Sequence, residues 1–110
     1  MFVTLDDLKR QRSDVLLKQN ESLEIAFNDP YMGTSLSLSL TDLLTNELIE
    51  TYDTEDCEHE DNEFYYYFKF PVLAVGQVGQ YKLRIMSITD NGDNTETIRL
   101  IGEVFVSVSE

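Results

Sequence analysis

The sequence predicts an all-β fold, a sandwich of two antiparallel sheets built from about seven strands. Apolar and polar residues alternate with a period of two in several segments, as in Gly79-Gln80-Tyr81-Lys82-Leu83-Arg84-Ile85. Turn residues separate these segments, and no segment is typical of a helix long enough to connect parallel strands. The chain has 110 residues and a hydrophobic content of 42%, which suffices for one domain with its own core.

Residues 1–14 are predicted to form an N-terminal arm ahead of a sandwich domain at residues 15–110. Thr4 suits the N-cap of a short helix that runs to about Gln11, with acids in its first turn and cations near its end. The first 20 residues hold four cations and three acids, whereas the rest hold four cations and 18 acids. The arm is therefore either a solvated terminus or a docking segment whose cations contact a neighbouring subunit: Lys9, Arg10 and Arg12.

The first half of the sandwich contains four predicted strands, at residues 15–18, 22–28, 35–40 and 47–52. The third is the clearest, because Leu36, Leu38 and Leu40 alternate with serines and would all point inward. A turn at residues 29–33 is indicated by its Pro and Gly. Residues 41–46 are expected to connect the third and fourth strands.

An acidic segment at residues 53–63 is predicted to be a solvated loop, because its seven carboxylates repel one another. Residues 64–70 then read as a strand with aromatic side chains on both faces, and Pro71 ends this strand or places it at a sheet edge. A short apolar run at residues 72–75 precedes the turn at residues 76–79.

A long hairpin, residues 79–107, is expected to organise the fold. Its first strand would point Tyr81, Leu83 and Ile85 inward, and its second would point inward the even-numbered Ile98, Leu100, Val104, Val106 and Val108. Gly102 marks a place where a bulge or a close backbone approach fits.

Two registers of this hairpin remain open. A two-residue loop at Asn91-Gly92 would oppose Ile85 to Ile98, and a four-residue loop would oppose Ile85 to Leu100 and Lys82 to Glu103. Turn preference favours the first register and charge pairing favours the second, and each contribution is of the order of 1 kcal/mol or less. Both registers keep the same inward face.

Composition excludes several classes of protein. The net charge of −13 argues against nucleic acid or an anionic membrane as the main partner. A single cysteine permits no intrachain disulfide, and neither a signal peptide nor a membrane span is recognisable in the sequence. We therefore expect synthesis in a cytosol without an export signal.

Candidate chemical sites are weak. The acidic segment with His59 has the oxygen ligands that calcium prefers, but it lacks the spacing of a calcium loop, and the run Asp90 to Asn94 is explained as a hairpin turn. Cys57 and His59 lie two residues apart among carboxylates, which would raise the thiol pKa and oppose activation. No catalytic residues, metal ligands or cofactor site are predicted, with calcium as the one cofactor left open.

A group of apolar residues falls on the predicted outward faces of the strands. Such residues gathered into one exposed patch would mark an interface. Strand pairing could instead separate them, or the N-terminal arm could cover them. The residues are Tyr65, Tyr67, Met86, Ile101 and Phe105.

Two segments, residues 19–27 and Gly79-Gln80-Tyr81-Lys82-Leu83-Arg84-Ile85, give the chain a resemblance to the small immunoglobulin-like modules of tailed bacteriophage virions. The first is a polar turn that opens an alternating strand, and the second is similar to the Gly-x-Tyr entry of a late sandwich strand. The resemblance implies an immunoglobulin-like β-sandwich in a capsid auxiliary or decoration protein, or in a head-tail or baseplate adaptor. It carries over no functional residues.

These observations predict a non-enzymatic structural protein of a virion, made in the host bacterial cytoplasm. Its partners would be a larger symmetric assembly, such as capsid or tail subunits, and other copies of the chain, with no direct contact to nucleic acid or membrane. The alternative is a β-sandwich module that binds carbohydrate or calcium through Tyr65, Tyr67 and the acidic segment. A small inhibitor that mimics nucleic acid is a third hypothesis, based on net charge alone.

Overall fold

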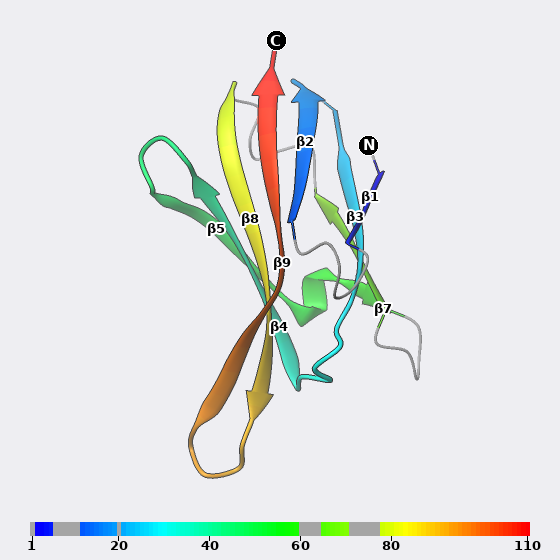
Figure 1. Cartoon of the computed structure of the whole chain (residues 1–110), viewed down its shortest axis with the longest axis vertical. Helices are drawn as coiled ribbons and strands as arrows, with labels where there is room; N and C mark the ends of the chain where they lie inside the picture. Colours follow the sequence, from blue (N-terminus) through cyan, green and yellow to red (C-terminus); the bar gives the residue numbers. More distant parts are fainter. Residues whose placement is uncertain (1, 6–11, 20, 60–64, 71–77) are drawn as a thin grey trace.

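The computed structural model describes residues 2–5, 12–19, 21–59, 65–70 and 78–110. These residues form two sheets that face each other (Figure 1). The prediction of an all-β sandwich is confirmed. The strands are β1 (Phe2–Leu5), β2 (Arg12–Lys18), β3 (Leu23–Asn28), β4 (Ser35–Asp42), β5 (Leu48–Asp53), β6 (Glu58–His59), β7 (Tyr65–Phe70), β8 (Gly79–Asp90) and β9 (Glu96–Ser109).

The two sheets are built from strands that lie far apart in the sequence. One sheet has the order β1-β3-β7-β6 and the other β2-β9-β8-β4-β5. Two pairs are parallel, β1 with β3 and β2 with β9, and the remaining pairs are antiparallel. The expectation of purely antiparallel sheets is therefore wrong at the N-terminal strands. The described part of the chain contains no helix that is long and apolar enough to cross a membrane.

The core lies between the two sheets and is built from the alternating residues that the sequence indicates. Leu36, Leu38 and Leu40 are all buried, as predicted. The rings of Phe27 and Tyr66 stack across β3 and β7 with their centroids 5.6 Å apart. The other core residues come from both sheets: Val15, Leu17, Leu23, Ile25, Cys57, Phe68, Tyr81, Leu83, Ile85, Ile101, Val104, Val106 and Val108.

The Gly-x-Tyr entry of β8 has a steric explanation. Tyr81 is buried, and its ring folds back over Gly79. A β-carbon at position 79 would lie 3.0 Å from the Tyr81 hydroxyl oxygen, closer than such contacts normally are. The glycine therefore leaves room for the tyrosine ring.

The N-terminal segment differs from the predicted arm. Residues 2–5 form β1, which pairs with β3 in register from Phe2 opposite Glu24 to Leu5 opposite Phe27. Thr4 therefore lies within a strand and caps no helix. The rest of the predicted helix lies outside the described residues. β2 begins at Arg12 and crosses the predicted boundary between residues 14 and 15.

The hairpin register differs from both predicted registers. A five-residue loop joins Asp90 to Glu96, which face each other, and the register shifts between Ile85 and Met86 because Ile85 faces Gly102 whereas Met86 faces Leu100. The extra residue in β9 is Ile101, so the predicted bulge at Gly102 is confirmed. The sequence did not predict the effect of this bulge. Between the bulge and the turn, the residues of β9 that were predicted to face inward face outward.

The acidic segment is more ordered than predicted as far as residue 59. Asp53 caps the 3₁₀ turn Thr54–Asp56: its carboxylate accepts from the Glu55 N–H at 2.9 Å, and Asp56 accepts from the Asp53 N–H at 2.9 Å. The next residues, Glu58–His59, form strand β6 at the edge of the four-stranded sheet. The expectation of a loop throughout is therefore wrong here, because the carboxylates serve as local backbone acceptors. Residues 60–63 of the segment lie outside the described residues.

Candidate interaction surface

The outer face of the five-stranded sheet gathers cationic side chains. Its register aligns Arg12, Glu103, Arg84 and Ser39 in one row across β2, β9, β8 and β4. The face holds four of the chain's eight cationic residues, in a chain whose net charge is −13. They are Arg12, Lys18, Lys82 and Arg84. The face is therefore far less acidic than the chain as a whole.

Arg12, which was predicted to belong to the N-terminal arm, lies at the β2 edge of this face and contacts Phe105 on β9. Its guanidinium sits over the Phe105 ring, 4.0 Å from the centroid, and its Nη2 lies 3.3 Å from a carboxylate oxygen of Asp14. Because Arg12 and Asp14 are both well exposed, this ion pair adds little stability. The Phe105 contact holds the guanidinium over the ring, and the exposed side chain leaves its other donors available to a partner.

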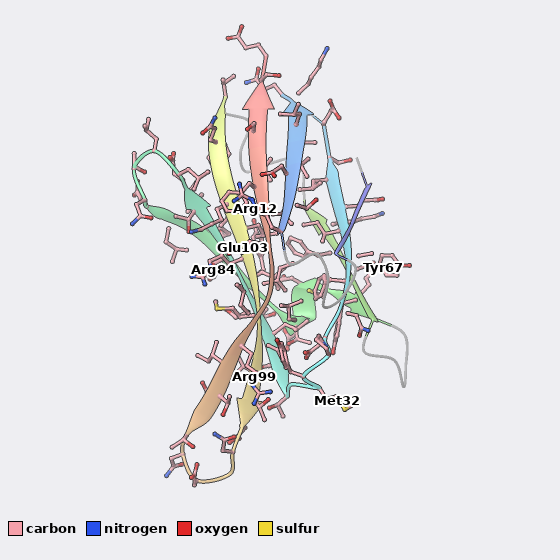
Figure 2. The ribbon with its side chains drawn as sticks, viewed as in Figure 1. Arg12, Met32, Tyr67, Arg84, Arg99 and Glu103 are labelled. Atoms are coloured by element: carbon pink, nitrogen blue, oxygen red, sulfur yellow. The ribbon has the colours of Figure 1, made fainter. Side chains whose placement is uncertain are left out.

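Arg84 and Glu103 form the centre of the face, as Figure 2 shows. The Arg84 Nε lies 3.7 Å from a Glu103 carboxylate oxygen. Among the described residues, this buried Nε has no hydrogen-bond partner. A buried donor without a partner lowers stability.

Apolar side chains continue the face toward the tip of the β8–β9 hairpin. Met86 faces Leu100, and Ile88 faces Ile98, which is 57% exposed. The sequence prediction placed Ile98 and Leu100 inward. The bulge reverses them, so that Arg99 takes the inner side instead and lies over the Tyr31 ring, 5.1 Å from its centroid.

The predicted interaction residues do not form a single patch. Met86 and Phe105 share the outer face of the five-stranded sheet, whereas Tyr67 is 42% exposed on the four-stranded sheet and points away from it (Figure 2). Ile101 was predicted to face outward and is 7% exposed in the core, because it is the bulge residue. The side chain of Tyr65, and all of Lys9 and Arg10, lie outside what the structure describes.

The sequence did not predict a second group of exposed apolar side chains, which lies outside the outward-facing residues named above. The β4–β5 hairpin carries four exposed aliphatic side chains: Leu43, Leu44, Leu48 and Ile49. Leu44 is 92% exposed at the turn, where Asp42 accepts hydrogen bonds from the Leu44 and Thr45 N–H groups. The signal available in the sequence was the pair Leu43-Leu44 inside a segment predicted to be a connection between strands.

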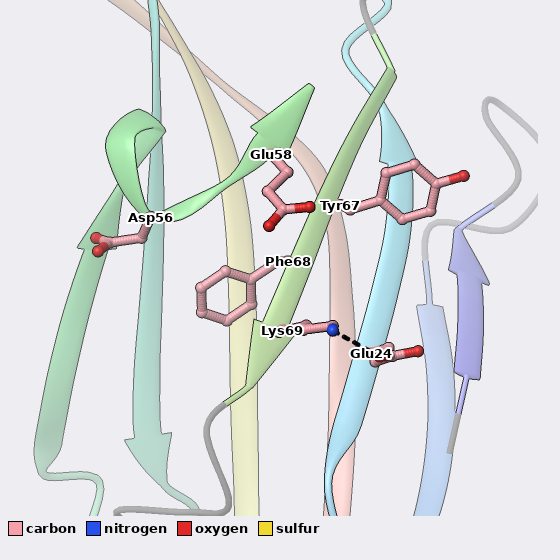
Figure 3. A pocket seen from close by; sticks show the side chains of 6 residues that line it. All are labelled: Glu24, Asp56, Glu58, Tyr67, Phe68 and Lys69. Carbon is pink, nitrogen blue, oxygen red and sulfur yellow. Dashed lines mark ion pairs between the residues drawn. The ribbon is translucent and has the colours of Figure 1, made fainter. Parts of the chain in front are cut away.

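A pocket of about 330 Å³ lies beside β7 (Figure 3). It is lined by Tyr67 and Phe68 and by charged side chains, of which Lys69 and Glu24 form an ion pair with an N–O distance of 3.6 Å. Asp56 and Glu58 complete the lining. The rings of Tyr67 and Phe68 point to opposite sides of β7 (Figure 3), so the pocket lies at this strand with three carboxylates and one ammonium group in its lining.

Cys57 is a buried core thiol. The pKa of the Cys57 thiol is raised to about 12, first by burial and then by the carboxylates of Asp56 and Asp53. The predicted upward direction is confirmed, although burial contributes more than charge. Such a thiol is not a nucleophile near neutral pH. The side chain of His59 lies outside what the structure describes.

The turn at residues 90–95 uses its carboxylates to hold its own backbone. The Gly92 N–H donates to Asp90 at 2.9 Å, and both the N–H and the hydroxyl of Thr95 donate to Asp93. Gly92 and Asn94 adopt positive φ, at 80° and 66°. The described residues contain no group of three or more His, Cys, Asp or Glu arranged to hold a metal.

Among solved structures, the chain is similar to the N-terminal domain of ORF48 of phage TP901-1, with a TM-score of 0.61. The two chains share one fold. The similarity covers 100% of both chains at 12% sequence identity, and it supports the resemblance to phage modules that the sequence indicates. No protein-family model and no curated protein sequence matches the chain.

Proposed function

We propose that the chain is a non-enzymatic structural component of a phage virion, which docks on a larger assembly through the outer face of its five-stranded sheet. The observation that carries the proposal is the full-length similarity to a domain of a phage protein. The surface supports the same function. A face with four cations, an exposed guanidinium and neighbouring apolar side chains, in a chain of net charge −13, suits an acidic protein partner.

The location within a virion follows from the same proposal. Synthesis takes place in the host bacterial cytoplasm, and the chain then joins the particle as a capsid auxiliary or decoration protein, or as a head-tail or baseplate adaptor. Mass spectrometry of purified particles of the phage that encodes the chain tests this step. The chain should be present in particles and absent from particles of a phage with the gene deleted; its absence from intact particles would refute the virion role.

The docking face is tested by a matched pair of substitutions. Phe105→Glu places an acid at the centre of the cationic face, and Tyr67→Glu places the same acid on the opposite sheet. We expect the Phe105 variant to be lost from purified particles and the Tyr67 variant to be retained. Equal incorporation of both variants would exclude this face as the docking surface.

A docking role for Lys9 and Arg10 remains part of the proposal. Truncation of residues 1–14 is a poor test, because it removes β1 and the first residues of β2. Replacement of both cations with glutamate leaves these strands intact. Weaker incorporation into particles, with an unchanged melting temperature, would support a docking arm, and unchanged incorporation would remove it.

The pocket beside β7 favours a second candidate function, the binding of a carbohydrate. The exposed ring of Tyr67 and the nearby carboxylates offer one ring surface and several hydrogen-bond acceptors in about 330 Å³. Calorimetric titration with oligosaccharides of the host cell surface tests it, with Tyr67→Ala as the variant that should lose the heat signal. A flat titration with the unmodified chain would remove this candidate.

A further inference from the structure

The five-stranded sheet has two open edges of opposite charge. Within the described residues, β2 pairs only with β9, and β5 pairs only with β4, so these two strands form the opposite edges of the sheet and neither has a strand partner on its other side (Figure 1). The β2 edge carries Arg12, Asp14 and Lys18, a net charge of +1, and the β5 edge carries Glu50 and Asp53, with Glu47 just before it. Open edges are sites where another strand can add.

Each edge also exposes an apolar side chain near its middle or end. Leu16 on β2 is 77% exposed, and Leu48 on β5 is 56% exposed, with Ile49 beside it. Both point to the outer face of the sheet: Leu16 lies between the outward Asp14 and Lys18, and Leu48 faces the outward Thr41. Protected edges of monomeric proteins normally carry charge without such leucines.

Strand direction makes the two edges compatible. β2 runs parallel to β9, and three antiparallel pairs then lead through β8 and β4 to β5. β5 therefore runs antiparallel to β2 within one sheet. A second copy placed beside the first, in the same orientation, would bring its β2 against β5 as an antiparallel pair, the more stable of the two arrangements.

We propose that copies of this chain associate head to tail through their sheet edges, with β5 of one copy pairing with β2 of the next. A register that matches the outer faces places Arg12 opposite Asp53 and Asp14 opposite Thr51. Continuing along the strands, Leu16 falls beside Leu48 and Ile49, and Lys18 falls beside Glu47. Two opposite-charge contacts thus flank one apolar contact.

Charge also selects this pairing over the symmetric ones. Two β5 edges brought together would oppose acids to acids, and two antiparallel β2 edges would oppose Arg12 to Lys18. Like charges placed directly opposite each other destabilise a strand pair. The remaining combination joins two different surfaces, and an interface of that kind continues into a ring or a filament and does not stop at a dimer.

The inference is independent of the virion role, because it concerns the purified chain alone. Sedimentation velocity over a range of protein concentrations should show species larger than a dimer. These species should decrease at high salt, since ionic strength screens the exposed charge pairs. A chain that stays monomeric over the whole range, or that stops at a symmetric dimer, would overturn the proposal.

Two single substitutions and their combination locate the interface. Leu16→Glu brings an acid to the acidic β5 edge, and Leu48→Lys brings a cation to the cationic β2 edge; each should weaken self-association by about tenfold or more. The double variant restores an opposite-charge contact and should regain association. Loss in both single variants without recovery in the double variant, or loss in only one of them, would contradict the edge pairing.

A matched control distinguishes edge pairing from nonspecific hydrophobic association. Ile98→Glu replaces a side chain of similar exposure, 57%, on the distal hairpin and away from both edges. It should leave self-association unchanged, and all variants should keep their far-ultraviolet circular dichroism. If Ile98→Glu reduces association as much as Leu16→Glu, the contact runs through the sheet face and the edge proposal fails.

Discussion

The two halves of the β8–β9 hairpin differ in which residues of β9 are buried, and the bulge at Ile101 separates these halves. In the first half, from Gly79 opposite Val108 to Ile85 opposite Gly102, Leu83 and Val104 are fully buried because the four-stranded sheet faces them. In the distal half, Ile98 is exposed, and the turn is held by its own hydrogen bonds. Apolar alternation therefore predicts the buried face of β9 only as far as the bulge, beyond which the same alternation points Ile98 outward.

The largest test of this contrast compares Leu83→Ala with Ile98→Ala. Leu83 has no exposed surface, so its truncation should lower the free energy of unfolding by about 2–5 kcal/mol. Truncation of the exposed Ile98 should change it by no more than about 0.5 kcal/mol. Chemical denaturation of both variants measures the difference. Similar losses of unfolding free energy in the two variants would mean that the half of the hairpin around Ile98 is as tightly packed as the half around Leu83.

The next test concerns Asp29, which ties the β3–β4 turn to the hairpin just beyond the bulge. Its buried carboxylate accepts from the N–H groups of Tyr31 and Gly33 at 3.0 and 2.9 Å, and from the Ser87 hydroxyl at 2.8 Å. Asp29→Ala leaves three donors without a partner and should cost about 1.5–3 kcal/mol. Ser87→Ala removes one of these bonds and should cost less. Equal costs in denaturation experiments would show that the backbone contacts add nothing.

Most of the sandwich could be predicted from the sequence, because local patterns determine it. The strand at Leu36, Leu38 and Leu40 alternates without interruption, and Gly79 with Tyr81 marks the start of β8. β1 and the two-residue β6 carry no such pattern. Their strand form depends on pairing with β3 and β7, which are distant in the sequence.

The candidate surface could be predicted only in part. Gly102 indicates a bulge, but the register shift, which buries Ile101 and turns Ile98 outward, depends on the length of the loop after Asp90. Likewise, Arg12 meets Phe105 only because β2 pairs in parallel with β9, a contact between the two ends of the chain. Local signals do not encode such pairings.

A test by pH compares two titrating groups in the two regions. The Cys57 thiol is buried in the core, where its pKa rises from 9.0 to about 12. The folded state therefore keeps this proton when the unfolded state has lost it. The resulting contribution to stability is complete below pH 9 and is lost as the pH rises from 9 toward 12.

Denaturation midpoints measured between pH 8 and 10 should fall with pH in the natural chain and fall less steeply in Cys57→Ala. The pKa values of Tyr52, Tyr66 and Tyr81 are also raised by burial, so these residues add a further decline above pH 10 in both chains. Thiol alkylation should be slow in the folded chain and fast in denaturant. Identical pH profiles for the two chains would show that the thiol is not buried.

The smallest effect is expected at the distal turn. The hydroxyl and N–H of Thr95 donate to Asp93 and lower the pKa of that exposed carboxyl. A lowered pKa favours folding above the unfolded value of 3.8, and this contribution is lost as the pH falls through the lowered value. Thr95→Ala should raise the Asp93 pKa measured by NMR while the denaturation midpoint at pH 7 stays unchanged. A clear drop in that midpoint would mean that the turn contributes to the stability of the whole sandwich, and that the two halves of the hairpin unfold as one unit.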